Sequence, residues 1–221
     1  MAASGADRNS FLRIIEAPGE VEEYFLFRLD GREMLSAPFE WRLTLRTHVE
    51  VPPPSGWIGA SITFSMGGSD TVPRKVNGQC VRFEHAYQKG GYTEFVIDIA
   101  PSLMMTRLRR DYRIFTNVTA KQVINTILTE HGIVFDDTKV KYVTEVREYC
   151  VQYEESDFDF INRLMEDEGI FYFFKYDENA GRYKHKTYLA DDPSGYYDGD
   201  VFSLSFRRDH LLRGLQSIET S

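Results

Sequence analysis

The chain has 221 residues and a formal net charge of −8, with 42% hydrophobic and 27% charged residues. This composition is typical of a soluble globular protein, and the length allows one large or two small domains with a buried core. The acidic balance argues against a nucleic-acid-binding protein, because such proteins usually carry a surplus of basic residues.

The same sequence gives no sign of a membrane protein. No apolar stretch approaches the ~20 residues that a bilayer-spanning helix needs. The first residues, MAASGADRNSF, lack the basic start and apolar run of a signal peptide. We therefore expect no membrane span and expect the chain to be made and folded in the cytoplasm.

The first half of the chain is predicted to consist of strands. Strand patterns cover residues 11–17 and 24–31, and residues 38–47 alternate strictly, with Phe39, Trp41, Leu43 and Leu45 on one face. The segment VPPPSG at residues 51–56 predicts a turn or loop, and the strand pattern resumes in WIGASITFSM.

A hairpin follows these strands. Val81 and Phe83 alternate with the charged residues Arg82 and Glu84, and after the turn an alternation resumes at Phe95, Ile97 and Ile99. The residues between and beside these three are Glu94, Val96 and Asp98, and QKGG at residues 88–91 supplies glycines for a tight connection. Several short strands joined by turns predict a barrel or a sandwich.

The middle of the chain begins with a basic cluster, RLRRDYR, at residues 107–113. These arginines could bind phosphate or nucleic acid, but we favour pairing with acidic groups of segment 145–168, either within one chain or across an interface. TAKQVINTILTEHG then predicts a helix that starts with a capping box at Thr119 and Gln122 and ends at Gly132. Four apolar residues of that helix form one stripe: Val123, Ile124, Ile127 and Leu128.

The stretch REYCVQYEESDFDFINRLMEDEGIFYFF at residues 147–174 is crowded with carboxylates. Ser156 and Asp159 have the spacing of a helix start, and Gly169 is placed to end that helix. Four apolar residues lie on one face of this predicted helix: Phe160, Ile161, Leu164 and Met165. We therefore expect Asp157 and Asp159 to complement the helix dipole in the first turn, with the carboxylates solvent-facing or paired, and expect strands at IFYFF and KHKTYLAD.

No pattern for catalysis, a cofactor or a metal emerges. The nearest match to a nucleophile elbow, Gly59-Ala-Ser61-Ile-Thr63, lacks the closing glycine and lies in a strand pattern. Cys80 and Cys150 are expected to be small core residues. The histidines do not share helix-face spacing, and surface or capping roles are expected for His48, His85, His131, His185 and His210. We expect no catalytic, cofactor-binding or metal-binding residues.

The block at residues 147–174 resembles the signature region of the VgrG proteins, the spike of the bacterial type VI secretion system, which in turn resemble the baseplate hub of contractile-tailed phages. Other matching segments stand in order: PFEWRLTLRT, DYRIF at residues 111–115, EHG, and LADDPSGYY. The resemblance covers nearly the whole chain, from about Phe11 to about Ser205.

The resemblance implies a mainly β fold with α insertions, similar to a phage baseplate hub. We expect a first β-barrel domain over residues 1–115, a mixed α/β segment over residues 116–190, and the start of a second, truncated barrel over residues 191–221. It also implies a structural role without enzymatic activity. Such hubs form homotrimers, cap the tube of Hcp hexamers, contact baseplate components, and deliver effectors with a PAAR tip through a C-terminal part absent here. They assemble in the cytoplasm and leave the cell through the type VI machinery.

Three alternatives remain open. One is a phage or prophage tail hub of the same fold, and another is an effector adaptor. The third is an acid/base hydrolase, such as a glycosidase that uses Asp157 or Asp159 with Glu166. Carboxylates on one helix face are poorly suited to flank a substrate in a cleft, which disfavours the hydrolase.

Overall fold

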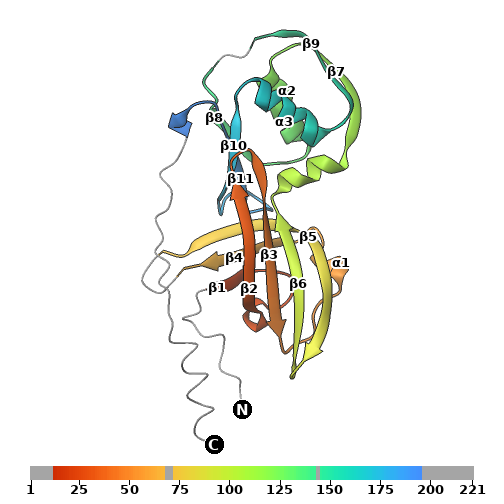
Figure 1. The fold of residues 1–221 in the computed structure, drawn as a ribbon, viewed down its shortest axis with the longest axis vertical. Helices are drawn as coiled ribbons and strands as arrows, with labels where there is room; N and C mark the ends of the chain where they lie inside the picture. Colours follow the sequence, from red (N-terminus) through yellow and green to blue (C-terminus); the bar gives the residue numbers. More distant parts are fainter. Residues whose placement is uncertain (1–11, 68–71, 143–144, 196–221) are drawn as a thin grey trace, which may run out of the picture.

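The computed structural model describes residues 12–67, 72–142 and 145–195. A curved β-sheet lies at one end of the long axis, and two helices with two small sheets lie at the other (Figure 1). Within these described residues, none of the helices has the length and apolar character required to span a membrane.

The first part is a six-stranded antiparallel sheet in the order β1-β4-β5-β6-β3-β2. A 3₁₀ helix, η1 (Val21–Glu23), and a short helix, α1 (Pro54–Trp57), lie in its connections, so the predicted loop at residues 51–56 contains the start of a helical turn. The strands are β1 (Leu12–Glu16), β2 (Phe25–Met34), β3 (Ala37–Thr47), β4 (Ser61–Met66), β5 (Arg74–Lys89) and β6 (Tyr92–Ala100).

Strand β3 confirms the predicted alternation. Phe39, Leu43 and Leu45 are buried and Trp41 is half-buried, whereas Glu40 is exposed. Side chains of a strand point alternately to its two faces, so this pattern fixes which face of the sheet covers the core. Trp57 is completely buried in that core, with its ring 5.1 Å from the ring of Phe95.

The predicted hairpin of β5 and β6 is confirmed, but the expected alternation of β5 is wrong at one residue. Cys80 pairs with Ile99 and Arg82 pairs with Asp98, so Val81 is an extra residue that β6 does not match. Such a β-bulge shifts the alternation of its strand. Val81 is therefore 42% exposed instead of facing the core.

The second part contains two helices, a three-stranded sheet in the order β10-β11-β8 and a two-stranded sheet of β7 and β9. Strand β11 runs antiparallel to β10 and parallel to β8. The elements are η2 (Ser102–Leu108), β7 (Arg110–Val118), α2 (Ala120–Glu130), β8 (Phe135–Lys139), β9 (Arg147–Ser156), α3 (Asp157–Asp167), β10 (Phe171–Tyr176), β11 (His185–Ala190) and η3 (Pro193–Gly195).

Both predicted helices are confirmed, together with their ends. The Thr119 hydroxyl accepts from the Gln122 backbone N–H at 3.2 Å, and the Gln122 side chain accepts from the Thr119 N–H, which completes the capping box. Ser156 caps α3 by accepting from the Asp159 N–H at 3.1 Å. The apolar stripes of α2 and α3 are buried in one core with Leu103, so α3 packs against α2 and η2.

The mainly β fold with α insertions is confirmed. Among the described strands, β1 and β2 end the first sheet without pairing with each other. Strand β7 crosses residue 115, and the domain limits given above stay predictions. The start of a second barrel falls mostly on residues 196–221, which lie outside the described residues.

The two parts meet at a junction that we define by His185, Asn77 and Ser102. His185 is 3% exposed, so the expectation of a surface or capping role is wrong for it. Its Nε2 accepts from the Ser102 backbone N–H at 3.0 Å, so its Nδ1 carries the proton that faces the Asn77 Oδ1, also at 3.0 Å. Burial lowers the pKa of His185 to about 4, and the imidazole is neutral at neutral pH.

Candidate interaction surface

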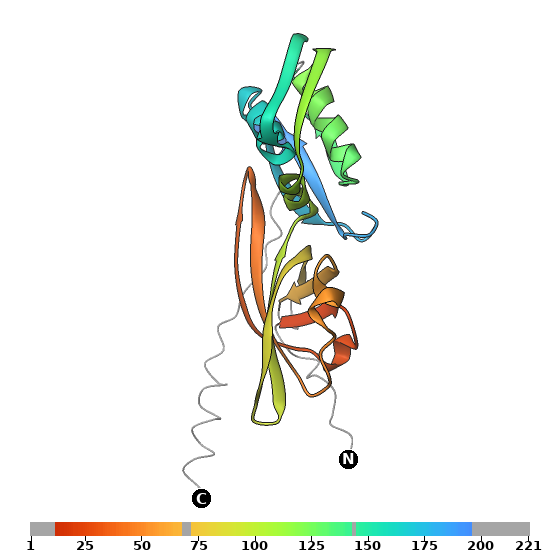
Figure 2. The same ribbon diagram turned by 90° about the vertical axis from the view of Figure 1, so that its right-hand side faces the viewer.

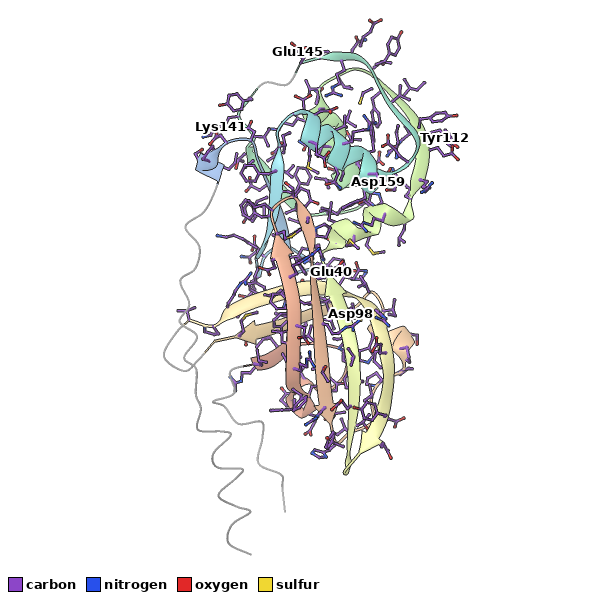
Figure 3. The ribbon with its side chains drawn as sticks, in the orientation of Figure 1. Glu40, Asp98, Tyr112, Lys141, Glu145 and Asp159 are labelled. Carbon is purple, nitrogen blue, oxygen red and sulfur yellow. The ribbon has the colours of Figure 1, made fainter. Side chains whose placement is uncertain are left out.

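Strands β7 and β9 form a two-stranded ribbon that extends beyond α2 and α3 at one end of the molecule (Figure 2). Three cross-strand pairs share its outer side, Tyr112 with Tyr153, Ile114 with Val151, and Thr116 with Tyr149. We call these six residues the ribbon face. Tyr112 points away from the helices (Figure 3).

The ribbon face is apolar and largely exposed. The exposed fractions are 63% for Tyr112, 68% for Ile114, 65% for Tyr149, 44% for Val151 and 72% for Tyr153. The ring centroids of Tyr112 and Tyr153 lie 5.4 Å apart in an edge-to-face arrangement. This contact holds the two side chains against each other across the strands. Apolar residues scattered singly over a surface need no explanation, whereas a contiguous exposed apolar patch is a candidate interaction site.

The inner side of the ribbon packs on the second core. Cys150 is buried there as a free thiol, and Phe115 packs against the same core. Arg113 and Gln152 are cross-strand neighbours on this side, and the Arg113 Nε donates to the Gln152 Oε1 at 2.9 Å. Arg113 and Gln152 thus lie on the inner side, while the three tyrosines, Ile114 and Val151 are exposed on the outer side.

A buried carboxylate fixes the ribbon to α3. Asp157, the first residue of α3, is fully buried. Its Oδ1 accepts from the Arg113 Nη2 at 2.7 Å and from the Gln152 Nε2 at 2.8 Å. Its Oδ2 lies 2.7 Å from the His131 Nε2 at the end of α2. The Arg109 Nε also lies 2.7 Å from Oδ2, as an ion pair without hydrogen-bond alignment.

Glu130 closes this cluster on its outer side. It pairs with Arg109, and its Oε2 lies 2.8 Å from the Arg113 Nη1. Burial raises the pKa of Asp157, but hydrogen bonds from His131 and Gln152 and the charges of the two arginines outweigh burial and hold the pKa below its ordinary value. Asp157 therefore stays ionised and joins β7, β9, α2 and α3.

The predicted charge pairing is confirmed for Arg109 and Arg113, and it lies within the chain. Asp157 is indeed in the first turn of α3, but it is buried and paired and does not belong to the solvated side of the helix. Asp159 and Glu166 are exposed. The three carboxylates of the hydrolase alternative thus do not share one accessible cleft in the described residues.

The other predicted positions have ordinary surroundings. Cys80 and Cys150 are buried free cysteines, as expected. His48 is exposed with Nδ1 3.0 Å from the Gly91 carbonyl oxygen, and His131 is the C-cap of α2. The side chain of His85 and all of His210 lie outside the described residues. The residues that the structure describes contain no group of three or more metal-ligating side chains.

The ribbon was not predicted from the sequence. Residues 107–113 were interpreted there as a charge cluster, and no strand was expected over residues 147–156. A signal was present in Tyr149, Val151 and Tyr153, which alternate with Cys150 and Gln152. A half-buried strand normally buries its apolar side, whereas this strand exposes it.

Residues 32–209 match the family described as phage tail baseplate hub (GPD). Among curated proteins, the type VI secretion system spike protein VgrG1b of Pseudomonas aeruginosa is 30% identical over 80% of this chain and 23% of its own length. VgrG1c of the same organism is 31% identical over 90% of this chain and 28% of its own length. The chain thus spans about a quarter of these relatives.

Two solved structures have the same fold. The Escherichia coli c3393 protein, described as a type VI secretion component similar to the T4 phage tail proteins gp27 and gp5, matches with a TM-score of 0.69 and 24% identity, over 85% of this chain and 51% of its own. A Francisella PdpA–VgrG complex matches with a TM-score of 0.58 and 11% identity, over 92% of this chain and 32% of its own. The resemblance to VgrG proteins found in the sequence is confirmed.

Proposed function

Because the chain belongs to the phage tail baseplate hub (GPD) family, we propose that it is the hub region of a type VI secretion spike. The observation that supports this most strongly is the family match over residues 32–209 together with relatives that are themselves named type VI spike proteins. In this role the chain forms a homotrimer, caps the tube of Hcp hexamers and helps to deliver effectors when the machine contracts.

The remaining partners follow from the same role. The protein contacts baseplate components, and a PAAR tip and effectors travel with it. It assembles in the cytoplasm and leaves the cell through the type VI machinery. It contacts no nucleic acid.

The role is structural and not enzymatic. The matched relatives are spike proteins, and the one with a catalytic name, the actin cross-linking toxin VgrG1 of Vibrio cholerae, is matched over only 17% of its length. The buried Asp157 is engaged by two arginines, which leaves it no access to a substrate. The buried cluster around Asp157 therefore has a structural role.

Release of Hcp tests the proposal. The coding region is deleted in the host, close paralogues are removed, and Hcp is measured in culture supernatant and in cells. We expect Hcp to remain inside the cells at its normal level and release to return with the intact gene. Unchanged release of Hcp would contradict the proposal in that host.

A phage or prophage tail hub is the second candidate, and the family's own description as a phage tail baseplate hub favours it. The two roles share the fold and differ in the particle that carries the protein. If Hcp release is unchanged, purified phage-like particles from the same host are probed for the chain. Its presence there assigns the tail role.

A further inference from the structure

We propose that the junction of His185, Asn77 and Ser102 is an acid-operated switch, which holds the two parts together while the imidazole is neutral and releases them when the imidazole takes up a proton. The proposal rests on this junction alone and is independent of the spike role proposed above.

The hydrogen bonds of the junction require a neutral ring in one tautomer. The Asn77 Nδ2 donates to the Thr63 hydroxyl at 2.8 Å and to the Ile62 carbonyl at 3.2 Å, so the Asn77 Oδ1 is the atom that accepts from His185. The His185 Nε2 is then the acceptor of the Ser102 N–H. A proton on Nε2 would point at that N–H and remove its acceptor.

The rings around His185 disfavour a charged imidazole. The rings of Phe39 on β3 and Phe174 on β10 lie 6.1 and 6.3 Å from the imidazole, and the Tyr183 ring lies 6.0 Å from it. Glu40, the neighbour of Phe39, is exposed and points to the opposite face of β3. The buried ring thus has apolar neighbours where an imidazolium would need a carboxylate.

The charged side chains that flank His185 on β11 are engaged with other partners. Lys184 and Lys186 point to the opposite face of the strand, because neighbouring side chains of a strand alternate. They pair with Glu16 and Asp136 at 3.2 and 3.0 Å. Neither of these carboxylates forms an ion pair with His185.

The other elements around the ring contribute cations and a tyrosine. Tyr176 of β10 lies opposite His185, and the Lys75 ammonium of β5 lies 5.2 Å from the Tyr176 ring. In η2, the Arg107 guanidinium lies over the ring of Phe158 at 4.2 Å. A proton on His185 would therefore add positive charge without a nearby anion among the described residues.

The junction is connected to further strands of the first sheet by buried hydrogen bonds. Thr63, which accepts from Asn77, is completely buried, and its hydroxyl donates to the Glu16 Oε2 at 3.0 Å. Glu16 pairs in turn with Lys184, the neighbour of His185. The polar contacts thus join η2, β11, β5, β4 and β1. Release of His185 leaves buried polar groups unpaired on both sides of the boundary, so it weakens the attachment of the two parts.

The direction of the pH effect follows from the two states of the ring. Burial lowers the pKa of His185 to about 4, whereas a released ring has its ordinary pKa of 6.5. The released state therefore binds the proton more readily than the folded state. The stability that the junction contributes is present above pH 6.5 and is lost as the pH falls towards 4.

Two matched substitutions test the proposal in the 221-residue chain. His185→Gln keeps an amide oxygen that can accept from Ser102 and an amide N–H that can donate to Asn77, but glutamine does not take up a proton. His48→Gln makes the same change at an exposed histidine of the first part. Urea unfolding of the parent and both variants is followed by tryptophan fluorescence and by circular dichroism from about pH 7 to about pH 4.5.

We expect the folded-to-unfolded ratio of the parent to fall more than about tenfold relative to that of His185→Gln over this range. At about pH 4.5 the fluorescence and circular dichroism transitions should separate in the parent and in His48→Gln, and they should coincide in His185→Gln. The comparison cancels the titration of carboxylates and of the other histidines, because the parent and His185→Gln share these groups.

Three results would overturn the proposal. One is the same pH dependence of stability in the parent and in His185→Gln. Another is a parent whose two transitions still coincide at about pH 4.5. The third is a change in His48→Gln as large as the change in His185→Gln.

Nitrogen NMR of the parent provides a readout that needs no substitution and decides the question if His185→Gln does not fold. The His185 ring should carry its proton on Nδ1 at neutral pH and should stay neutral at about pH 5.5, where an ordinary histidine is mostly protonated. A proton on Nε2 at neutral pH, or a ring that titrates at its ordinary pKa, would also overturn the proposal. Failure of the Hcp-release test would leave these results intact, so the two proposals fail separately.

Discussion

The carboxylate of Asp157 is fully buried and lies within 2.8 Å of four side chains, Arg109, Arg113, His131 and Gln152. A buried charge of this kind is tolerated only while its partners stay in place. The two arginines come from the segment before and within β7, so the cluster decides how the ribbon sits on the helices. The sequence predicted that these arginines pair with acidic residues. It could not identify Asp157 as the buried partner, because Asp159 lies in the same first turn of α3.

We predict that Asp157→Asn destabilises the chain strongly. The substitution keeps the shape but removes the buried charge that Arg109, Arg113 and His131 face, while Glu130 still pairs with both arginines. A buried hydrogen-bonded group that loses its partner costs about 1–3 kcal/mol, and more when charge is involved. Urea unfolding followed by circular dichroism measures the free energy of unfolding.

Asp159→Asn is the matched control, because Asp159 lies in the same helical turn but is exposed. Its side chain accepts only from the Ser156 hydroxyl in the described structure, at 2.6 Å, and its dipole interaction is worth about 0.3–1 kcal/mol. Equal losses in the two variants would show that the buried cluster contributes nothing beyond ordinary helix capping.

At the scale of elements, periodicity predicted those strands and helices whose apolar side is buried. It failed where tertiary contacts decide the outcome. Strand β8 carries two aspartates, which disfavour a strand, and it forms only by parallel pairing with β11. The ribbon was missed for the opposite reason, because its apolar side is exposed.

The pairing of β2 with β3 gives a prediction at this scale. Gly31 lies opposite Trp41, and a Cβ atom at Gly31 would approach the Trp41 ring to 1.9 Å. We predict that Gly31→Ala displaces the indole and destabilises the chain by about 1–3 kcal/mol, as expected for overpacking. Thermal unfolding and the tryptophan emission maximum are the measurements.

Gly56→Ala is the control for Gly31→Ala. Gly56 lies in α1, and the nearest atom to an added Cβ is 3.9 Å away, so no displacement is required. Alanine is the better helix former, which predicts unchanged or raised stability. The steric argument fails if Gly31→Ala behaves like Gly56→Ala.

At the scale of the whole molecule, the junction of His185, Asn77 and Ser102 joins the first sheet to the second part. Other contacts cross the same boundary. The Ser36 backbone N–H donates to the Tyr172 carbonyl at 2.9 Å, where the tip of the β2–β3 hairpin reaches β10. None of these contacts was predicted from the sequence, because each joins residues far apart in the chain whose proximity only the folded topology creates.

Coupling of the two parts can be measured because their spectroscopic reporters are separate. Both tryptophans, Trp41 and Trp57, lie in the first part, and both long helices lie in the second. Tryptophan fluorescence therefore follows the first core, and circular dichroism at helical wavelengths follows the second. We predict that the two urea transitions coincide in the parent chain, as two-state unfolding requires.

His185→Ala should separate these transitions. It removes the acceptor of the Ser102 N–H and the donor to Asn77, and it leaves buried polar groups unpaired on both sides of the boundary, which costs about 1–3 kcal/mol for each group. His48→Ala is the matched control, because His48 is exposed within the first part, and its transitions should still coincide. If the transitions of His185→Ala also coincide, the remaining contacts, such as the hydrogen bond from Ser36 to Tyr172, couple the two parts without this histidine.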